Sequence, residues 1–238
     1  MERSVPTREQ RQAQTRRRLL AAAARVFAAR GFHGASVSAI AATAGLTTGA
    51  LYANFAGKED LFLEMIDAQL AGQADALAEL DAISDPAQMR AQLRQRVEQL
   101  LAGMASPGDL LAPEDDGSLT TIQVQTLTLE FLLYVVRERP DLHDEITTRY
   151  RTVEVQLAGI FERWLNAEGR TSDIPPEELA KIQSWLIEGM GLRLLQDPDH
   201  IEPSRAADLY LRLLTDLPLR PSADMSDILD MSDDSDIS

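Results

Sequence analysis

A tight helix-turn-helix pattern near the N-terminus constrains the fold of this 238-residue chain more than any other feature. After Ser36, a good N-cap residue, apolar side chains recur at helical spacing over positions 37–44, and Gly45 ends the run. Two helices that cross steeply need a small residue at the crossing, a turn residue that accepts a positive φ, and an aliphatic residue beyond. Ala41, Gly45 and Leu51 meet these needs, so we expect a helix-turn-helix here.

Almost all of the remaining chain also predicts helix, because apolar residues recur at helical spacing and Pro, Gly and Asp separate the runs. We expect a first helix that ends at Gly31, a short third helix after Thr47 that carries Phe55, and a fourth opened by Gly57. Longer helices are expected near residues 86–105, 118–139, 140–167, 175–196 and 203–217. No strand pattern competes with them, and residues 106–118 have the composition of a loop. The predicted fold class is all-α.

The charge divides the chain unevenly. Residues 1–58 carry a net charge of +7 and the remainder carries −22, which together make the net charge of −15. A basic segment in an acidic protein indicates contact with a polyanion, although a solvated basic helix would have the same charge. From position 221 onward the chain has six Asp and no basic residue. We therefore expect three parts: an N-terminal arm and helix-turn-helix domain (1–57), a larger helical domain (58–220) and a disordered acidic tail (221–238).

Several classes of protein are disfavoured by composition. The chain has no cysteine, so it forms no disulfide or thiolate metal site, which suits a reducing cytoplasm. Its first residues lack the apolar segment of a signal peptide, and no apolar run is long enough to cross a membrane. The three histidines are isolated, and no Walker loop, G-x-G-x-x-G or nucleophile elbow is present. We expect a cytoplasmic protein with no metal, no cofactor, no membrane partner and no enzymatic activity.

One segment carries a family likeness. The matching residues are Leu19, Leu20, Ala23, Phe27, Gly31 and Phe32, then Ser36, Val37, Ile40, Ala41, Ala44 and Gly45, then Thr47, Gly49, Leu51, Tyr52, Phe55, Lys58 and Leu61. With these residues the segment resembles the N-terminal domain of the TetR (tetracycline-repressor) family of bacterial transcription regulators. The resemblance implies a homodimer that binds double-stranded DNA at a palindromic operator, and C-terminal helices that serve dimerisation and bind a small-molecule effector. The chain departs from the family at Thr48, Ala53 and Asn54, so the resemblance implies no operator sequence.

The helix-turn-helix supplies the candidate DNA contacts. The N-terminus of the recognition helix favours a phosphate, Thr48 offers a hydroxyl or a methyl to a base, and Tyr52 and Lys58 offer polar groups to phosphates. The complete predicted set is Arg16, Ser36, Thr47, Thr48, Gly49, Tyr52, Asn54 and Lys58. Each has a plainer alternative: Thr47 as only an N-cap, Tyr52 as core, and Lys58 or Arg16 as a solvated charge.

The last two long helices are the candidate dimer interface. By position they match the family's dimerisation pair, and their apolar stripes include Ile182, Leu186, Gly189, Leu209, Leu213 and Leu217. An intramolecular core stripe is the alternative. Glycine inside a helix costs stability, so a close approach of another helix or a kink would explain Gly189.

The candidate effector pocket begins with the Thr- and Gln-rich helix near 118–128, because pockets are mostly apolar with a few polar groups. The predicted lining is Gln123, Thr126, Tyr134, Phe161, Trp164, Trp185 and Met190. Solvent exposure of the polar members and a core position for the aromatic ones are the alternatives. We expect a repressor released by a small, largely apolar effector. A constitutive DNA-binding protein without effector, or a helical enzyme that uses the cavity, remains an alternative.

Overall fold

The structure of the protein, a computed structural model, describes residues 7–105, 119–197, 199, 202–215 and 219–221. Its elements in chain order are α1 (Arg8–Gly34), α2 (Val37–Thr43), α3 (Thr48–Tyr52), α4 (Lys58–Asp81), α5 (Pro86–Ala105), α6 (Thr121–Glu138), the 3₁₀ turn η1 (Pro140–Leu142), α7 (His143–Ala167), β1 (Arg170–Ser172), α8 (Pro176–Gln196), α9 (Pro203–Thr215) and β2 (Leu219–Pro221). The fold is all-helical apart from the two short strands, as predicted.

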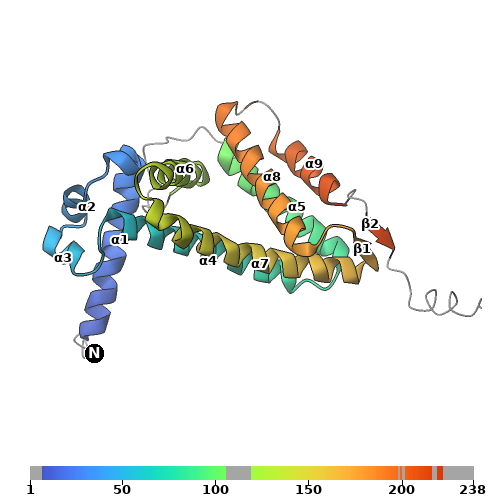
Figure 1. Cartoon of the computed structure of the whole chain (residues 1–238), viewed down its shortest axis with the longest axis horizontal. Helices are drawn as coiled ribbons and strands as arrows, with labels where there is room; N and C mark the ends of the chain where they lie inside the picture. Colours follow the sequence, from blue (N-terminus) through green and yellow to red (C-terminus); the bar gives the residue numbers. More distant parts are fainter. Residues whose placement is uncertain (1–6, 106–118, 198, 200–201, 216–218, 222–238) are drawn as a thin grey trace, which may run out of the picture.

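The molecule is elongated (Figure 1). Helices α1, α2 and α3 form one end, which we call the head. Helices α4 and α7 pack against each other and run from the head to the other end, where α5, α8 and α9 gather. Helix α6 packs across the inner end of the head, against α1. None of the helices that the structure describes is long and apolar enough to cross a membrane.

The predicted helices differ from the observed ones only near their ends. The helix expected at 86–105 coincides with α5, whereas α9 ends at Thr215 and α6 begins at Thr121. Helix α3 is shorter than expected, so Phe55 lies after it. Gly31 does break the first helix, with φ 67° and ψ 173°, but the chain resumes a further helical turn to Gly34.

The break at Gly31 is held by another helix. The carboxylate of Glu130 in α6 accepts a hydrogen bond of 2.7 Å from the backbone N–H of Phe32. A Cβ at position 31 would lie 2.7 Å from that same carboxylate, and the positive φ also favours glycine. The end of α1 is therefore shaped jointly by its own glycine and by a residue about a hundred positions away.

The expectation of no strand was wrong in one place. Strands β1 and β2 pair antiparallel, with Arg170 opposite Pro221, Thr171 opposite Arg220 and Ser172 opposite Leu219. Strands of three residues are too short for a period-of-two pattern to appear in the sequence. They form because Gly169, at φ 60°, turns the chain after α7 and brings it beside the segment after α9. The predicted loop at 106–118 and the predicted acidic tail after 221 lie outside the described residues.

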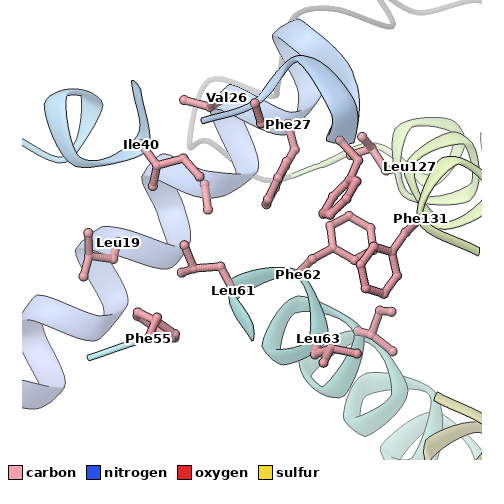
Figure 2. Close-up of a cluster of buried hydrophobic side chains, with 14 of the residues drawn as sticks. Leu19, Val26, Phe27, Ile40, Phe55, Leu61, Phe62, Leu63, Leu127 and Phe131 are labelled. Carbon is pink, nitrogen blue, oxygen red and sulfur yellow. The ribbon is translucent and has the colours of Figure 1, made fainter. Parts of the chain in front are cut away.

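Two hydrophobic clusters organise the molecule. The head cluster joins α1, α2 and α3 to the first half of α4 and to α6, and Figure 2 shows its rings meeting between these helices. The distal cluster joins α5, α7, α8 and α9. Leu61, Phe62 and Ile66 of α4 belong to the head cluster, so the core of the head continues past residue 57. The domain boundary expected there stays a prediction.

Candidate nucleic-acid interface

Helices α2 and α3 form the predicted helix-turn-helix. The hydroxyl of Ser36 accepts a bond of 3.2 Å from the N–H of Ala39, which caps α2. Gly45 adopts φ 64°, and the next N–H, of Leu46, returns to the carbonyl of Ala41 at 2.9 Å. Leu51 is fully buried. The small residue, the turn glycine and the aliphatic residue occupy the places that the spacing predicted.

The exposed side of α3 presents a compact polar surface. Thr47 caps the helix, with its hydroxyl accepting from the N–H of Ala50 at 3.1 Å. Thr47, Thr48, Gly49 and Tyr52 are all exposed, Tyr52 to 61%. A Cβ on Gly49 would meet only the hydroxyl of Thr47, at 3.8 Å. We call these four residues the α3 face. It is open to a flat partner, and core packing does not explain the exposure of the Tyr52 ring.

Arg16 has an internal role in this structure. It is half-buried, donates from Nη1 to the carbonyl of Asn54 at 2.5 Å, and forms an ion pair with Glu64. Its guanidinium carbon lies 4.2 Å from the centre of the Phe55 ring. These contacts tie α1 to the connection between α3 and α4. The sequence could not predict these contacts, because the three partners of Arg16 lie 38 or more positions further along the chain.

Asn54 is also turned inward. Its Nδ2 donates to the carbonyl of Ala50 at 2.8 Å, at the end of α3. Its Oδ1 is buried, with no hydrogen-bond partner among the described residues. The side chain therefore completes the last turn of α3 and does not extend the α3 face.

Lys58 caps a helix from a distance. Its ammonium group donates to the carbonyls of Phe32, Ala35 and His33 at 3.0, 3.3 and 3.5 Å, and it lies 4.5 Å from the centre of the Phe32 ring. An ammonium has three donors, and these three carbonyls occupy them. A cation near the end of a helix also interacts favourably with its dipole. In this arrangement Lys58 anchors α4 to the end of α1 and has no donor left for a phosphate.

Further polar residues of the head make local contacts or stay exposed. Arg18 donates from Nη2 to the carbonyl of Ala44 at 2.7 Å and so caps α2, and the hydroxyl of Ser38 lies 3.1 Å from that of Ser36. Exposed Ser38 follows the cap in the sequence, which was the available signal. Arg17 is exposed and forms no ion pair among the described residues. Its positive charge is therefore not paired with a carboxylate of the described residues.

The polar side chains predicted for the effector pocket form hydrogen bonds inside the protein, two of them within helix α6 and one to α4. Gln123, 1% exposed, closes a capping box with Thr120: its Oε1 accepts from the N–H of Thr120 at 3.0 Å. Thr126 donates its hydroxyl to the carbonyl of Ile122 at 2.9 Å. Tyr134 donates to Glu59 of α4 at 2.8 Å, and burial together with that carboxylate raises the pKa of Tyr134. None of the three lines the distal cavity described next.

A cavity lies at the other end of the molecule. Its lining comes from α4, α5, α7, α8 and α9: Leu77, Leu80, Met89, Arg90, Leu93, Leu157, Ile160, Phe161, Trp164, Gln183, Tyr210, Leu211 and Leu214. Phe161 and Trp164 line this cavity, and their contact with an effector stays a prediction. Met190 packs on the distal cluster without lining it, and Trp185 is 64% exposed on the outside of α8.

The predicted dimer residues divide between two environments. Gly189, Leu209 and Leu213 are exposed, together with Trp185 and Leu192. Leu186 packs on the distal cluster, Ile182 is half-buried, and Leu217 lies outside the described residues. Among the described residues, nothing beyond its own helix lies within 4 Å of a Cβ placed on Gly189, whereas one on Gly191 would lie 2.6 Å from the sulfur of Met104. Close packing inside the chain explains Gly191 and leaves Gly189 on the surface.

Comparison with known proteins agrees with this geometry. Residues 19–65 match the family described as bacterial regulatory proteins, tetR family. Over 53 residues the chain is 49% identical to the HTH-type transcriptional regulator YdgC of Bacillus subtilis (strain 168), itself uncharacterized; the match covers 22% of this chain and 27% of YdgC, about a quarter of its length.

Two solved structures share the fold over most of their length. The regulator FadR from Bacillus subtilis in complex with stearoyl-CoA has a TM-score of 0.61, with 17% identity, and covers 83% of this chain and 96% of its own. A protein from Saccharomonospora viridis in complex with choline has a TM-score of 0.60, with 23% identity, over 85% of this chain and 96% of its own. The helix-turn-helix, the matched family and the shared fold agree: residues 19–65 form a segment of the tetR family of bacterial regulatory proteins, in a chain whose fold is similar to these solved regulators.

Proposed function

We propose that this protein is a transcriptional repressor that binds a palindromic operator as a homodimer and is released by a small, largely apolar effector. The observation that carries the proposal is the α3 face, in which Thr48, Gly49 and Tyr52 are exposed on a helix held from behind by fully buried Leu51. A short helix with polar side chains outward and a packed inner side is suited to enter the major groove.

The contacts divide by chemistry. Thr48 is the candidate for base contact, because its hydroxyl and methyl both extend from an exposed position in the first turn of α3. Tyr52, with Arg17 of α1, is the candidate for phosphate contact, which positions a protein on DNA without specifying sequence. Lys58 and Arg16 belong to neither group, because their donors are used within the head. They act by positioning α4 and α1 around the α3 face.

A homodimer is supported by the outer surface of α8 and α9. Trp185, Leu192 and Leu213 are 64%, 44% and 54% exposed, and Leu209 is 37% exposed. Trp185 and Leu192 lie seven positions apart on α8, and Leu209 and Leu213 four apart on α9, so within each helix the two side chains share a face. Exposed apolar side chains of this kind indicate a contact with another protein. The two-fold symmetry of such a dimer would be matched by an inverted repeat in the DNA.

Release by an effector is supported by the path of α4. The 24-residue helix begins with Lys58 at the head and ends beside the cavity, which Leu77 and Leu80 line. At 1.5 Å per residue it reaches roughly 36 Å. An effector shifts the equilibrium only if it binds one conformation better than the other, and typical coupling is about 1–3 kcal/mol. FadR holds stearoyl-CoA and the Saccharomonospora viridis protein holds choline, so proteins of this fold take up small molecules of different chemistry.

The experiment that tests the proposal is selection of bound sites from random duplex DNA by the full chain. We expect an inverted repeat, and a complex whose mass corresponds to two chains on one site. Thr48→Ala should change the preferred sequence, whereas Tyr52→Phe should weaken all sequences alike. Selection that enriches no sequence, or a single half-site bound by one chain, would reject the homodimeric repressor.

A constitutive DNA-binding protein is the second candidate, since it needs the α3 face and no cavity. Titration of the bound operator with a molecule shown to occupy the cavity separates the two. Unchanged operator affinity at saturation supports the constitutive protein.

A further inference from the structure

The distal cavity contains three buried polar atoms that the fold does not satisfy. They are Nε1 of Trp164, Oε1 of Gln183 and the hydroxyl of Tyr210, and none makes a hydrogen bond of normal geometry among the described residues, although Gln183 lies near enough to the Tyr210 hydroxyl to lower its pKa against the larger effect of burial. Trp164 is 8% exposed and Tyr210 is 1% exposed. All three residues line the same cavity. Buried polar groups in folded proteins are nearly always paired, so three unpaired atoms in one cavity call for an explanation.

The rest of the cavity wall is apolar. Apart from Arg90, the remaining lining residues are Leu, Ile, Met and Phe side chains, from helices α4, α5, α7 and α9. The enclosed part of the space is about 70 Å³, which is below the usual range for a small-molecule site, and the cavity opens to solvent beyond it, so a ligand there would extend past the enclosed part. An apolar wall with a few convergent polar atoms is the usual composition of such a site.

The charges around the cavity exclude an ionic ligand. Among the described residues no acidic side chain lines it, so a cationic ligand would find no counter-charge from that part of the chain. Arg90 is already in an ion pair with Glu168, so an anionic ligand would have to displace that carboxylate. Taking an unpaired charge out of water is strongly unfavourable. The polar atoms themselves comprise one donor on Trp164, one acceptor on Gln183, and a hydroxyl that is both.

We propose that this cavity binds a neutral, mostly hydrocarbon molecule with a single hydroxyl or carbonyl group, held by hydrogen bonds to Trp164, Gln183 and Tyr210. The inference names the site and chemical class of the effector and in that respect rests on the proposed function. A hydroxyl on the ligand donates to Gln183 and accepts from Trp164 or Tyr210, and its hydrocarbon chain covers the leucines of α4 and α9. A ligand there touches Leu77 and Leu80, at the end of the helix that begins in the head.

The chain carries its own reporter for this site. It has two tryptophans, of which Trp164 lines the cavity and Trp185 is exposed on the outside of α8. In a Trp185→Phe background, the emission of Trp164 alone is followed during titration with 1-octanol, octanoate and octylammonium. We expect a saturable change with 1-octanol and affinities at least tenfold weaker for the two ions. Equal binding of either ion, or no saturable change with any alcohol from 1-hexanol to 1-decanol, overturns the proposal.

A second variant tests the hydrogen bonds. Tyr210→Phe keeps the ring and removes the hydroxyl, and it should weaken 1-octanol by about 2- to 10-fold, the usual effect of one neutral hydrogen bond. Tyr150→Phe is the matched control, because Tyr150 belongs to α7 and does not line the cavity. The control should bind 1-octanol as the parent does. Identical affinities for the two variants would show that ordered water satisfies the hydroxyl and that the ligand does not, which contradicts the proposal.

Operator affinity, measured on the same samples, separates this inference from the function on which it rests. If 1-octanol saturates the Trp164 signal without changing operator affinity, the cavity binds the alcohol but is not the effector site. Intact operator binding with no alcohol binding leaves the DNA-binding function and removes the site.

Discussion

The head and the distal half of the molecule are packed on different principles. In the head cluster, Phe27, Phe32, Phe62 and Phe131 are at most 3% exposed, and their ring centres lie 4.4–5.7 Å apart in the contacting pairs (Figure 2). The distal cluster instead surrounds a cavity, with the polar atoms of Trp164, Gln183 and Tyr210 unpaired beside it. The core of the head is closely packed, whereas the distal core borders a cavity.

The difference follows from the work each half is proposed to do. A surface that matches the groove of DNA must be held in one shape, and the head uses Arg16, Arg18, Lys58 and Glu130 as cross-links between its elements. A site for a small molecule needs space and unsatisfied polar atoms before the ligand arrives. The comparison predicts different responses to substitution in the two halves.

The largest effect is expected from emptying the head cluster. Phe32→Ala should lower the free energy of unfolding by about 3–5 kcal/mol, because the ring is fully buried and packs on the rings of Phe27, Phe62 and Phe131. Phe161→Ala is the distal counterpart and should cost less, since Phe161 already borders a cavity. Urea unfolding of both variants measures the difference. Equal costs would contradict the contrast in packing.

Lys58→Ala should show whether the lysine is a cross-link or a DNA contact. We expect a loss of about 1–3 kcal/mol in the free energy of unfolding, because three carbonyls at the end of α1 lose their donor. The salt dependence of operator binding should keep its slope. Lys181→Ala, at an exposed position in α8, is the control and should have little effect on stability. A slope reduced by about 0.9 with unchanged stability would instead identify a phosphate contact.

The cap of α3 gives a smaller effect. Thr47→Ala should cost about 1 kcal/mol, because the N–H of Ala50 loses its side-chain acceptor. Thr48→Ala, one residue further on and exposed, should be close to neutral for stability. Thr47→Ser restores the cap and should restore stability. If Thr47→Ala lowers operator affinity and Thr47→Ser does not restore it, the methyl group of Thr47 also contacts DNA.

The smallest effect concerns the outside of α8. Burial, and secondarily the charge of Glu154, raise the pKa of the Glu188 carboxyl above its usual value. A carboxyl whose pKa is higher in the folded state favours folding below its unfolded pKa, and this contribution declines as the pH rises through the folded pKa. Glu188→Gln should therefore gain a few tenths of a kcal/mol at pH 7 and less at pH 4. The gain is small because the carboxyl is only partly surrounded by protein and solvent still reaches the residue and screens its charge. Thermal unfolding at both pH values measures it, with Glu162→Gln in α7 as the control. A gain in stability that is larger at pH 4 than at pH 7 would contradict a raised pKa of Glu188.

The sequence predicted the helices well where local signals were strong. Proline or glycine marks an end of α2, α5 and α8, and those helices appear within a residue or two of their expected bounds, whereas α3 ends three residues before Phe55. It did less well with the roles of charged and polar side chains. Arg16 and Lys58 are of a type that suits phosphate, but carbonyls and a carboxylate from distant positions take up their donors. Gln123 and Thr126 have the composition of a pocket, but they close their own helix.

By itself the sequence determined what depends on neighbours along the chain: the helical periods, the caps Ser36 and Thr47, the positive-φ turn at Gly45 and the family of the helix-turn-helix. Only the tertiary structure decided which polar groups remain free. Each hydrogen-bond donor serves one partner, and the choice between an internal carbonyl and a ligand depends on residues far apart in sequence. For that reason Tyr52 stays available at the head, Lys58 does not, and the unpaired atoms of the cavity gather around Trp164.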